Sequence, residues 1–386
     1  MSEIAHIPQL RFPEFSGEWE EKRLGDIADF SKGKGISKSD IDNDGQLECI
    51  RYGELYTTYN ELIKDVHSKT NIAKEDVKLS QIGDVIIPAS GETAIDIATA
   101  SCVLKDGVAI GGDLNIIRSD IDGVFNAYYL NNKNKYSVAR LSQGSSVIHL
   151  YAKHLETLKL NLPTKPEQTK IAAFLTEVDT KIEQLSKKQE LLGEYKKGLM
   201  QQIFSQVIRF KADDGSEFPD WEEKKLRDVA KITTGSSNRE DSGLDGQYTF
   251  FDRSEDIRTS DRYLFDGKAV IVAGEGSRFP PKYFEGKFDL HQRTYAIMEF
   301  VEANSKYIFY FVDKQKNYLL RYAVGSTVKS LRLPIFQKMP VSLPSLPEQT
   351  KIANFLSSID NKIEQVGGQL DKSKQFKKAL LQQMFV

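Results

Sequence analysis

An internal repeat constrains this 386-residue chain more than any other feature. The string WEEKRLGDIA at 19–28 recurs as WEEKKLRDVA at 221–230, and both copies continue to a glycine, Gly33 and Gly235. Such a repeat predicts two copies of one structural unit rather than a single large core. The only two tryptophans, Trp19 and Trp221, occupy equivalent positions, and we expect both to be core anchors rather than ligand contacts.

A second match is longer and has a different offset. The string LPTKPEQTKIA at 162–172 recurs as LPSLPEQTKIA at 343–353, and the similarity continues without a gap to QQIF at 201–204 and QQMF at 382–385. This offset is smaller than that of the tryptophan strings, so the first globular part is the longer of the two. The ends of the repeated unit are alike and the middles have diverged. This pattern favours a common framework that carries two different recognition domains.

Faint similarity remains inside the diverged middles. An apolar run ending in a glycine-marked loop occurs at 83–91 and at 267–276, and GSSV at 144–147 matches GSTV at 325–328. GDLNII at 112–117 aligns with FDLHQR at 288–293. These matches predict equivalent strands and loops in the two halves.

Two long helices are predicted from the heptad spacing of apolar residues after Glu167 and Glu348. Pro166 and Pro347 suit a first helical turn, and the two glutamates favour the positive end of a helix. A lone amphipathic helix would leave its apolar stripe in water, so we expect the helices to pair antiparallel, with the globular domains at opposite ends. The residues expected to pair are Ile171, Val178, Leu185, Leu192, Leu199, Ile352, Ile359, Val366, Leu370 and Leu380.

The globular parts predict mixed, strand-rich structure. Short β-branched or aromatic runs lie at 84–87, 108–110, 269–272 and 295–298, and one helix is expected in each part, at 126–136 and 305–322. The predicted fold class is α+β, with two strand-rich mixed domains separated by two long antiparallel coiled-coil helices in a pseudo-twofold internal repeat. The expected boundaries are 1–165 and 207–345 for the domains, and 166–206 and 346–386 for the helices.

Composition excludes several classes of protein. With 40% hydrophobic and 28% charged residues, the chain predicts a folded globular protein. No apolar run is long enough to cross a membrane and the N-terminal residues lack a signal-peptide layout, so we expect a cytoplasmic protein without membrane contact. Cys49 and Cys102 have no C-x-x-C spacing and read as core thiols. The net charge of −2 does not suggest nucleic acid, but seven basic residues against one acid at 306–338 could bind phosphate locally.

Motifs of catalysis are missing from the sequence. It contains no N/D-P-P-Y/F tetrapeptide, no ATP-binding G-x-x-x-x-G-K-S/T loop and no glycine-rich dinucleotide motif in a strand–helix context. The five histidines show no metal-ligand spacing. We therefore expect no catalytic residue, no metal site and no cofactor bound by this chain.

The repeated string L-P-x-x-P-E-Q-x-x-I-A-x-F-L-x-x-x-D-x-K-I, each time ending in K-K-x-L-x-Q-Q-x-F, resembles the specificity subunit of type I restriction–modification enzymes. The W-x-x-x-x-L-x-D-I/V-A openings at Trp19 and Trp221 are similar to the start of that family's target-recognition domains. The resemblance covers the whole chain, although the middles match only in outline.

This resemblance implies a DNA-specificity subunit that is not itself an enzyme. Each globular domain would read one half of a bipartite, asymmetric double-stranded DNA sequence. The helices would act as a spacer and would dock two adenine methyltransferase (modification) subunits, which restriction/translocase subunits join. S-adenosylmethionine, ATP and Mg would be bound by those partners. The alternative is a non-DNA coiled-coil adaptor presenting two ligand-binding domains, which does not explain why the domains diverged while the helices stayed alike.

Candidate DNA contacts lie in glycine-flanked loops with short polar or basic side chains, because phosphate contacts supply affinity and base-edge contacts supply discrimination. For any one of them, an ordinary surface role stays open. Arg278 and Arg293 are the strongest candidates, since arginine is the commonest specific reader of guanine. In the first domain the candidates are Lys32, Lys34, Lys38, Arg51, Tyr52, Ser90, Glu92, Thr93, Gln143, Ser145 and Ser146. In the second domain they are Ser236, Ser237, Asn238, Arg239, Arg253, Ser254, Ser277, Arg278, His291, Gln292, Arg293, Ser326, Thr327 and Lys329, with the segment 275–278 as a whole of interest.

Overall fold

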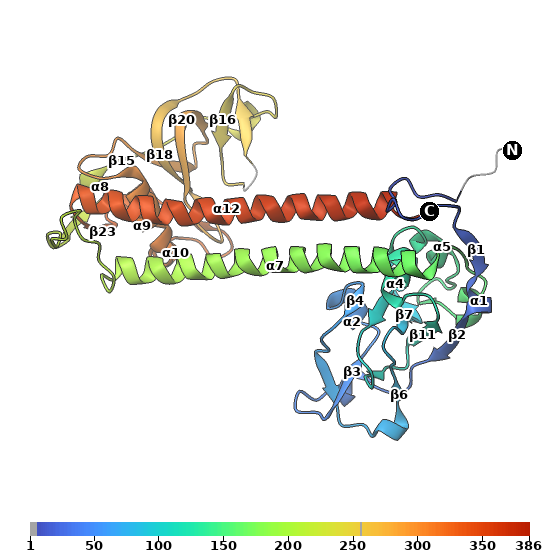
Figure 1. Ribbon diagram of the computed structural model, residues 1–386. Helices are drawn as coiled ribbons and strands as arrows, with labels where there is room; N and C mark the ends of the chain where they lie inside the picture. The colour runs from blue at the N-terminus through green and yellow to red at the C-terminus, as the bar shows by residue number, and fades with distance from the viewer. Residues whose placement is uncertain (1–5, 255–256) are drawn as a thin grey trace. The chain divides into compact units, whose positions relative to one another are not determined.

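The computed structural model describes residues 6–254 and 257–386, which divide into two compact units. Unit 1 comprises Met1–Leu185 and Gln369–Val386, and unit 2 comprises Ser186–Gly368. Each unit therefore contains one globular domain, the first half of the long helix that follows it and the second half of the other long helix (Figure 1). We call the globular part of unit 1 domain 1 and that of unit 2 domain 2.

Domain 1 is built on two sheets. The first has the order β2-β11-β7-β9-β4, in which β11 is antiparallel to both β2 and β7. The second has the order β5-β3-β10-β6. The strands are β2 (Ala28–Lys32), β11 (Leu114–Ser119), β7 (Val85–Pro88), β9 (Ser101–Val103), β4 (Leu62–Ile63), β5 (Ser68–Thr70), β3 (Leu47–Ile50), β10 (Ala109–Ile110) and β6 (Lys78–Leu79). Two short ladders pair β1 (Glu20–Arg23) with β13 (Lys159–Leu162) and β8 (Ser90–Gly91) with β12 (Ile148–His149).

Domain 2 has a single six-stranded sheet of order β15-β21-β18-β20-β16-β17. Its strands are β15 (Lys231–Thr234), β21 (Thr294–Met298), β18 (Phe265–Ala273), β20 (Lys282–Leu290), β16 (Tyr248–Phe251) and β17 (Arg258–Ser260). The short ladders recur, pairing β14 (Glu222–Lys225) with β23 (Pro340–Leu343) and β19 (Glu275–Gly276) with β22 (Lys329–Ser330). The two domains thus share a frame and differ in how the middle of the sheet is built.

Short helices complete both domains. Domain 1 holds α1 (Leu24–Ile27), α2 (Glu54–Thr57), α3 (Ala94–Ile97), α4 (Gly123–Asn131), α5 (Lys135–Arg140) and α6 (Ala152–Leu155). Domain 2 holds α8 (Leu226–Val229), α9 (Ser305–Lys314), α10 (Lys316–Tyr322) and α11 (Leu333–Gln337). The single helix expected in each domain is therefore two helices, α4–α5 and α9–α10, because the backbone leaves the helical conformation at Asn132 and Gln315.

The sheet register corrects one sequence match. Asn115 lies opposite Lys32, and Tyr295 lies opposite Thr234. Since Lys32 and Thr234 correspond through the tryptophan repeat, Asn115 corresponds to Tyr295. The alignment of 112–117 with 288–293, which placed Asn115 against His291, is therefore wrong. The register follows backbone hydrogen bonding, whereas the alignment followed a shared Asp-Leu pair.

The long helices are α7 (Lys165–Phe204) and α12 (Leu346–Gln383). In unit 1, Ile171 near the start of α7 shares a buried core with Leu380 near the end of α12. In unit 2, Ile352 near the start of α12 shares a core with Ile203 near the end of α7. Start-to-end contact within each unit is an antiparallel pairing, which confirms the predicted fold class.

The residues predicted to pair are buried or half-buried. The structure buries Ile171, Leu185, Ile352, Ile359, Val366, Leu370 and Leu380. It leaves Val178, Leu192 and Leu199 half-buried. Burial of this kind is what a role in helix pairing requires, since an exposed apolar seam would gain nothing from association.

The Pro-Glu-Gln triplet at the start of each long helix anchors the domain on the helix. In unit 1, Arg11 donates from Nε and Nη2 to the two carboxylate oxygens of Glu167, both at 2.8 Å. Gln168 accepts from the backbone N–H of Asp122 at 2.9 Å, and Asp122 caps α4. The side chain thus ties the start of α7 to the start of α4.

Unit 2 repeats these contacts. Arg209 donates to Glu348 through Nη2 at 2.9 Å and Nε at 3.3 Å, and Trp221 donates through Nε1 at 3.1 Å. Gln349 accepts from the backbone N–H of Asn304, the cap of α9, at 2.7 Å. The glutamates therefore act mainly as buried acceptors for arginine, beyond the helix-end role expected from their position.

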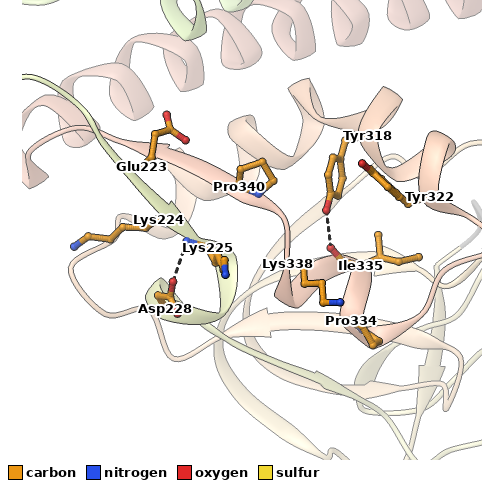
Figure 2. Close-up of a pocket in the computed structure, with 10 residues that line it drawn as sticks. All are labelled: Glu223, Lys224, Lys225, Asp228, Tyr318, Tyr322, Pro334, Ile335, Lys338 and Pro340. Carbon is orange, nitrogen blue, oxygen red and sulfur yellow. Dashed lines mark hydrogen bonds between the residues drawn. The ribbon is translucent and has the colours of Figure 1, made fainter.

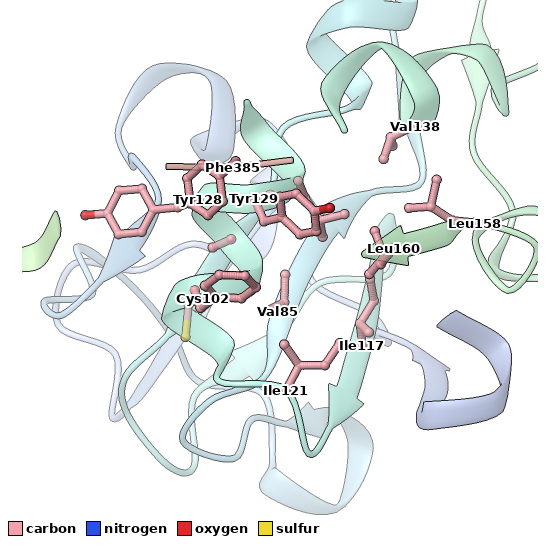
Figure 3. Close-up of a cluster of buried hydrophobic side chains, with 14 of the residues drawn as sticks. Val85, Cys102, Ile117, Ile121, Tyr128, Tyr129, Val138, Leu158, Leu160 and Phe385 are labelled. Carbon is pink, nitrogen blue, oxygen red and sulfur yellow. The ribbon is translucent and has the colours of Figure 1, made fainter. Parts of the chain in front are cut away.

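Aromatic packing fixes the core of unit 1. Trp19 is buried against Phe125 and Tyr129. Phe385, from the end of the chain, stacks on Tyr129 with ring centroids 5.3 Å apart (Figure 3). The core role predicted for Trp19 is confirmed, whereas Trp221 is half-buried and hydrogen-bonded. Cys102 lies in the same core, where burial raises the pKa of its thiol to about 12, as a core thiol requires.

No helix in residues 6–254 and 257–386 is long and apolar enough to span a membrane. Over the same residues, the histidine, cysteine and carboxylate side chains form no group of three or more that could hold a metal ion.

Candidate nucleic-acid interface

Four segments of domain 2 converge on one small cavity. They are the segment between β15 and β16, the residues that follow β16, the strand β19, and the loop between β20 and β21. The cavity has a volume of about 220 Å³ and is lined by Arg239, Asp252, Arg253, Glu275, His291, Gln292 and Arg293. Most of these residues were candidates from the sequence, and the structure brings them together from segments far apart in the chain.

Glu275 organises the charges of this cavity. Its carboxylate lies 2.8 Å from Nη1 of Arg293 and 3.6 Å from Nη1 of Arg253. The carboxylate is only 18% exposed, whereas the side chains of Arg293 and Arg253 are 63% and 62% exposed. One largely buried acid thus holds two guanidinium groups side by side at the surface, with most of each group open to solvent.

His291 adds a neutral donor to the cavity. Burial is the main reason that the pKa of His291 is lowered, so the imidazole is uncharged at pH 7. Its Nδ1 lies 3.1 Å from the backbone nitrogen of Arg293 and accepts that N–H. A neutral ring that accepts at Nδ1 carries its proton on Nε2. The cavity therefore presents arginine donors, an imidazole donor and carboxylate acceptors together.

A larger cavity of about 830 Å³ shares Asp252, Arg253 and Glu275 with the first. Among its other lining residues are the candidates Ser254, Ser277 and Arg278, together with Lys282 and Lys316. Burial alone would raise the pKa of Asp252, but hydrogen bonds from Ser254 to its carboxylate lower it, so this acid stays ionised beside Arg253. The two cavities form one continuous surface rich in arginine and lysine.

The remaining candidates of domain 2 fall into two groups. The exposed turn carrying Ser326 and Thr327 leads into Lys329 of β22, which pairs with Gly276 of β19 and so lies beside the cavities. Ser236 is exposed, and Asn238 accepts from the side-chain amide of Gln292 at 2.6 Å.

Ser237 differs from its neighbours. It is fully buried, where it donates to Asp289 at 2.6 Å and accepts from Arg262 at 2.8 Å. Its hydroxyl is therefore used inside the domain, and the proposed DNA contact at this residue does not fit the structure.

Domain 1 has an equivalent loop pair with different chemistry. The ladder β8–β12 corresponds to β19–β22, and it brings the candidates Ser90, Gln143, Ser145 and Ser146 into one region. Tyr56 donates to the carbonyl of Ser90 at 3.1 Å and packs against Tyr52 with ring centroids 6.3 Å apart. Tyrosine and serine thus stand where domain 2 has arginine and glutamate.

Other candidates of domain 1 lie around this region or serve its framework. Thr93 caps α3 by accepting the backbone N–H of Asp96, and Glu92 beside it is exposed. Arg51 lies against Gly111, and the backbone N–H of Lys34 donates to Ile110. Lys32 lies 3.8 Å from Asp113, and Lys38 is exposed at the start of a short helical turn. These three lysines thus lie outside the β8–β12 ladder.

A further cavity of about 750 Å³ lies between β14, α8, α10 and α11 of domain 2 (Figure 2). Tyr318 donates to the carbonyl of Ile335 at 3.3 Å across it. Its three lysines, Lys224, Lys225 and Lys338, are offset by Glu223 and Asp228, so it suits phosphate less well than the arginine-lined cavities. Its lining residues lie outside the loops predicted to contact DNA.

Sequence reasoning missed several residues of this surface. Asp252 and Lys282 lie in the diverged middle of domain 2, and Tyr56 lies in that of domain 1, so the repeat marks none of them. Lys316 belongs to the basic run at 306–338, which was noted as a possible phosphate patch. Glu275 belongs to the segment 275–278 that was already of interest, but its contacts with two arginines were not predicted.

Residues 16–192 and 219–372 match the family model described as the type I restriction modification DNA specificity domain. The chain belongs to the specificity subunits of type I restriction–modification systems. It is accordingly the DNA-specificity component of such a complex and not its catalytic subunit. The family predicted from the repeated strings is confirmed.

Two relatives of this chain are specificity subunits of type I restriction enzymes. This specificity subunit is 27% identical over 390 residues to the specificity subunit of type I restriction enzyme MjaVIII from Methanocaldococcus jannaschii, covering 92% of this chain and 88% of the relative. Over 166 residues it is 31% identical to the EcoDI specificity subunit of Escherichia coli, which covers 42% of this chain and 37% of the relative.

Solved structures share the fold. A crystal structure of a type I restriction–modification S subunit from M. genitalium has a TM-score of 0.69 and covers 98% of this chain and 99% of its own, at 15% identity. A structure from work on complex assembly and conformational transition of the type I R-M system has a TM-score of 0.51 at 17% identity, covering 94% of this chain and 96% of its own. These likenesses support the arrangement of two strand-rich domains and two packed helices.

Proposed function

We propose that each domain of this specificity subunit reads one half of a bipartite, asymmetric double-stranded DNA sequence. The observation that carries the proposal is the contrast between two equivalent ladders. Around β8–β12, domain 1 presents Tyr52, Tyr56 and Ser90, whereas around β19–β22 domain 2 presents Glu275 with its two arginines. Equivalent places with different donors and acceptors would read different bases, because base edges are distinguished by their hydrogen-bonding pattern.

In domain 2, base reading and phosphate contact would use different parts of the surface. A guanidinium that is already oriented by a carboxylate loses less freedom when it bonds a base edge. Arg293 is held in this way by Glu275. Arg278, Lys282 and Lys316 line the larger cavity, where Lys282 and Lys316 are suited to phosphates, which position the protein without selecting sequence.

The partners proposed for this chain are two adenine methyltransferase (modification) subunits, which restriction/translocase subunits join in the cytoplasm. S-adenosylmethionine, ATP and Mg would be bound by those subunits. Two aromatic side chains on the long helices support two copies of one partner: Tyr195 on α7 and Phe376 on α12 are 55% and 52% exposed and occupy equivalent positions of the repeat. Exposed aromatics of this kind are frequent anchors of protein interfaces.

Genome-wide mapping of methylated adenines tests the proposal. The chain is co-expressed with the methyltransferase encoded beside it in a host lacking other adenine methylation. We expect one motif with two unrelated half-sites at a fixed spacing. Random methylation, or a single undivided motif, would contradict bipartite reading. A chain that binds no DNA and supports no methylation would favour the coiled-coil adaptor.

Arginine substitutions in domain 2 test which side chains read bases. Replacing Arg293 or Arg278 with alanine should relax one position of one half-site, by about 1–3 kcal/mol per lost bidentate contact, and leave the other half-site unchanged. The measurement is competition binding between the mapped site and single-base variants. Lys231→Ala, at an exposed ion pair with Glu299, is the matched control and should change neither half-site. Uniform weakening on all DNA would instead assign the arginine to phosphate contact.

A further inference from the structure

One polar contact recurs in both units, at equivalent positions of the repeat. In unit 2, Nζ of Lys196 on α7 lies 2.5 Å from Oδ1 of Asp360 on α12, and the hydroxyl of Tyr310 on α9 donates to Oδ2 of Asp360 at 2.6 Å. We call Lys196, Asp360 and Tyr310 the α9 node. The node ties together a helix of the recognition domain, the long helix that follows it and the long helix of the other repeat.

Unit 1 contains the counterpart. Nζ of Lys377 on α12 lies 2.8 Å from Oδ1 of Asp179 on α7, and the hydroxyl of Tyr128 on α4 donates to Oδ2 of Asp179 at 2.5 Å. We call Lys377, Asp179 and Tyr128 the α4 node. Glu61 of domain 1 also accepts from Lys377, at 3.3 Å.

The α4 node is largely shielded from water and the α9 node is partly shielded, since Lys196 and Asp360 are 19% and 36% exposed. The lysine and aspartate of the α4 node are 18% and 17% exposed. Each lysine also lies over the ring of its tyrosine, with Nζ 5.1 Å from the centroid in the α9 node and 5.3 Å in the α4 node. Burial alone would lower the pKa of Lys377, but Glu61 and Asp179 outweigh it and the pKa is raised, so the ammonium stays charged.

Each node fixes a register between α7 and α12, and the two registers agree. The step along α7 from Asp179 to Lys196 equals the step along α12 from Asp360 to Lys377. In an antiparallel pair, equal steps in opposite directions keep the same register. The two units therefore specify one register independently.

The apolar seam cannot specify this register alone. A slip of one heptad leaves apolar residues facing apolar residues, because the spacing repeats every seven positions. The same slip would place Lys196 opposite Ala353 or Gly367, and Asp179 opposite Leu370 or Met384. Charges facing such residues lose their partners, and an uncompensated buried charge is strongly destabilising. The nodes thus disfavour a slip of one heptad in either direction.

We propose that Lys196 and Lys377, acting through Asp360 and Asp179, are positioning residues that fix the register of α7 on α12 and thereby the spacing between the two DNA half-sites. The spacing part rests on the proposed bipartite reading. One heptad of helix is about 10 Å long at 1.5 Å per residue, which corresponds to about three base pairs at 3.4 Å each. A slipped register would therefore change the spacing by a whole number of base pairs that methylation mapping resolves.

Disulfide trapping in the full chain tests the register without DNA. A Cβ on Gly367 would lie 2.7 Å from Nε2 of Gln189, so Gln189→Cys with Gly367→Cys reports the native register. Gln189→Cys with Lys374→Cys, one heptad further on, reports a slip. The native Cys49 and Cys102 are buried and do not compete. In the wild-type background we expect the first pair alone to cross-link.

Each of the two cysteine pairs is then introduced into three variants of the nodes. An apolar-node variant carries Lys196→Met, Asp360→Leu, Tyr310→Phe, Lys377→Met, Asp179→Leu and Tyr128→Phe, together with Glu61→Gln, because Glu61 would otherwise lose Lys377 and keep an unpaired, largely buried charge. It should fold, because charges are replaced by apolar groups rather than left unpaired, and its slipped pair should cross-link at least about tenfold more than in wild type, a change of about 1.4 kcal/mol between registers. A charge-swapped variant, which exchanges lysine and aspartate within each node and also carries Glu61→Gln to avoid two carboxylates facing each other, should return to native cross-linking. A single-node variant, altered only in the α9 node, keeps the folded state and should stay in the native register.

The outcomes separate the two parts of the proposal. Exclusive native cross-linking in the apolar-node variant would overturn the register role, as would failure of the charge swap to restore it. If that variant does not fold, the charge-swapped variant decides the question: native trapping supports the register role, and trapping of the slipped pair overturns it. Methylation mapping of the apolar-node variant should show half-sites at the native spacing and at about three base pairs more or fewer. Slipped cross-links with unchanged spacing would overturn the link to DNA, whereas a wild-type chain without a bipartite motif would count against the proposed function alone.

Discussion

Replacing Arg209 with methionine is expected to lower the free energy of unfolding of unit 2 by about 3–5 kcal/mol, because it strands a buried carboxylate. The carboxylate of Glu348 is fully buried and takes two hydrogen bonds from Arg209, at 2.9 Å and 3.3 Å. Methionine retains most of the apolar stem, so the loss is mainly that of the charged partner. Trp221 alone, donating at 3.1 Å, leaves the negative charge uncompensated.

Denaturant titration followed by tryptophan fluorescence measures this loss, and amide hydrogen exchange assigns it to unit 2. The matched control is Lys211→Met, which breaks the exposed pair with Glu217 and should leave the free energy of unfolding nearly unchanged, because solvent screens such a pair. Adding Glu348→Gln to Arg209→Met should recover part of the stability, since the buried charge is then removed. A double variant no more stable than the single one would show that the arginine acts by packing rather than by pairing.

The sequence predicted the long helices better than it predicted how the domains attach to them. The arginine–glutamate contacts of the two units show why. The heptads and the prolines located α7 and α12 closely, because both signals are local. The partners of the two glutamates are not local: Arg11 lies 156 residues before Glu167, and Arg209 lies 139 residues before Glu348. Only the fold shows that the repeated Pro-Glu-Gln string docks a domain.

The candidate site was likewise predicted only where the sequence signal is local. Loops at the ends of repeat-aligned strands could be found from glycines and polar residues, and the structure gathers Arg253, Arg293 and Arg278 around two joined cavities. Whether a given polar side chain faces outward could not be found in this way. Ser237 points into the domain because Asp289 and Arg262, 52 and 25 residues away, supply its hydrogen bonds. Glu275 gains its importance only from arginines on two other segments.

Gly235→Ala is expected to disturb the DNA-contact surface proposed for domain 2, although Gly235 lines neither of its two cavities. A Cβ at this position would lie 1.6 Å from the carbonyl oxygen of Leu290, a backbone atom that cannot simply swing aside. Leu290 is followed directly by His291, Gln292 and Arg293, which line the smaller cavity. We expect a cost of about 3 kcal/mol, at the upper end of overpacking effects, together with displacement of this loop. The repeat supports the argument, since a Cβ on the equivalent Gly33 would lie 2.0 Å from the carbonyl oxygen of Gly111.

Methylation mapping and competition binding of the Gly235→Ala subunit should show the half-site of domain 2 relaxed or lost and that of domain 1 unchanged. Gly243→Ala is the matched control in the same domain, because a Cβ there meets no atom within 4 Å. Alanine at such a site is neutral or mildly stabilising, by up to about 1 kcal/mol. If both variants kept the wild-type motif and stability, the close approach of Gly235 to Leu290 would not be needed to hold the loop. Loss of both half-sites together would instead indicate that the whole chain, rather than the reader of one half-site, had been disturbed.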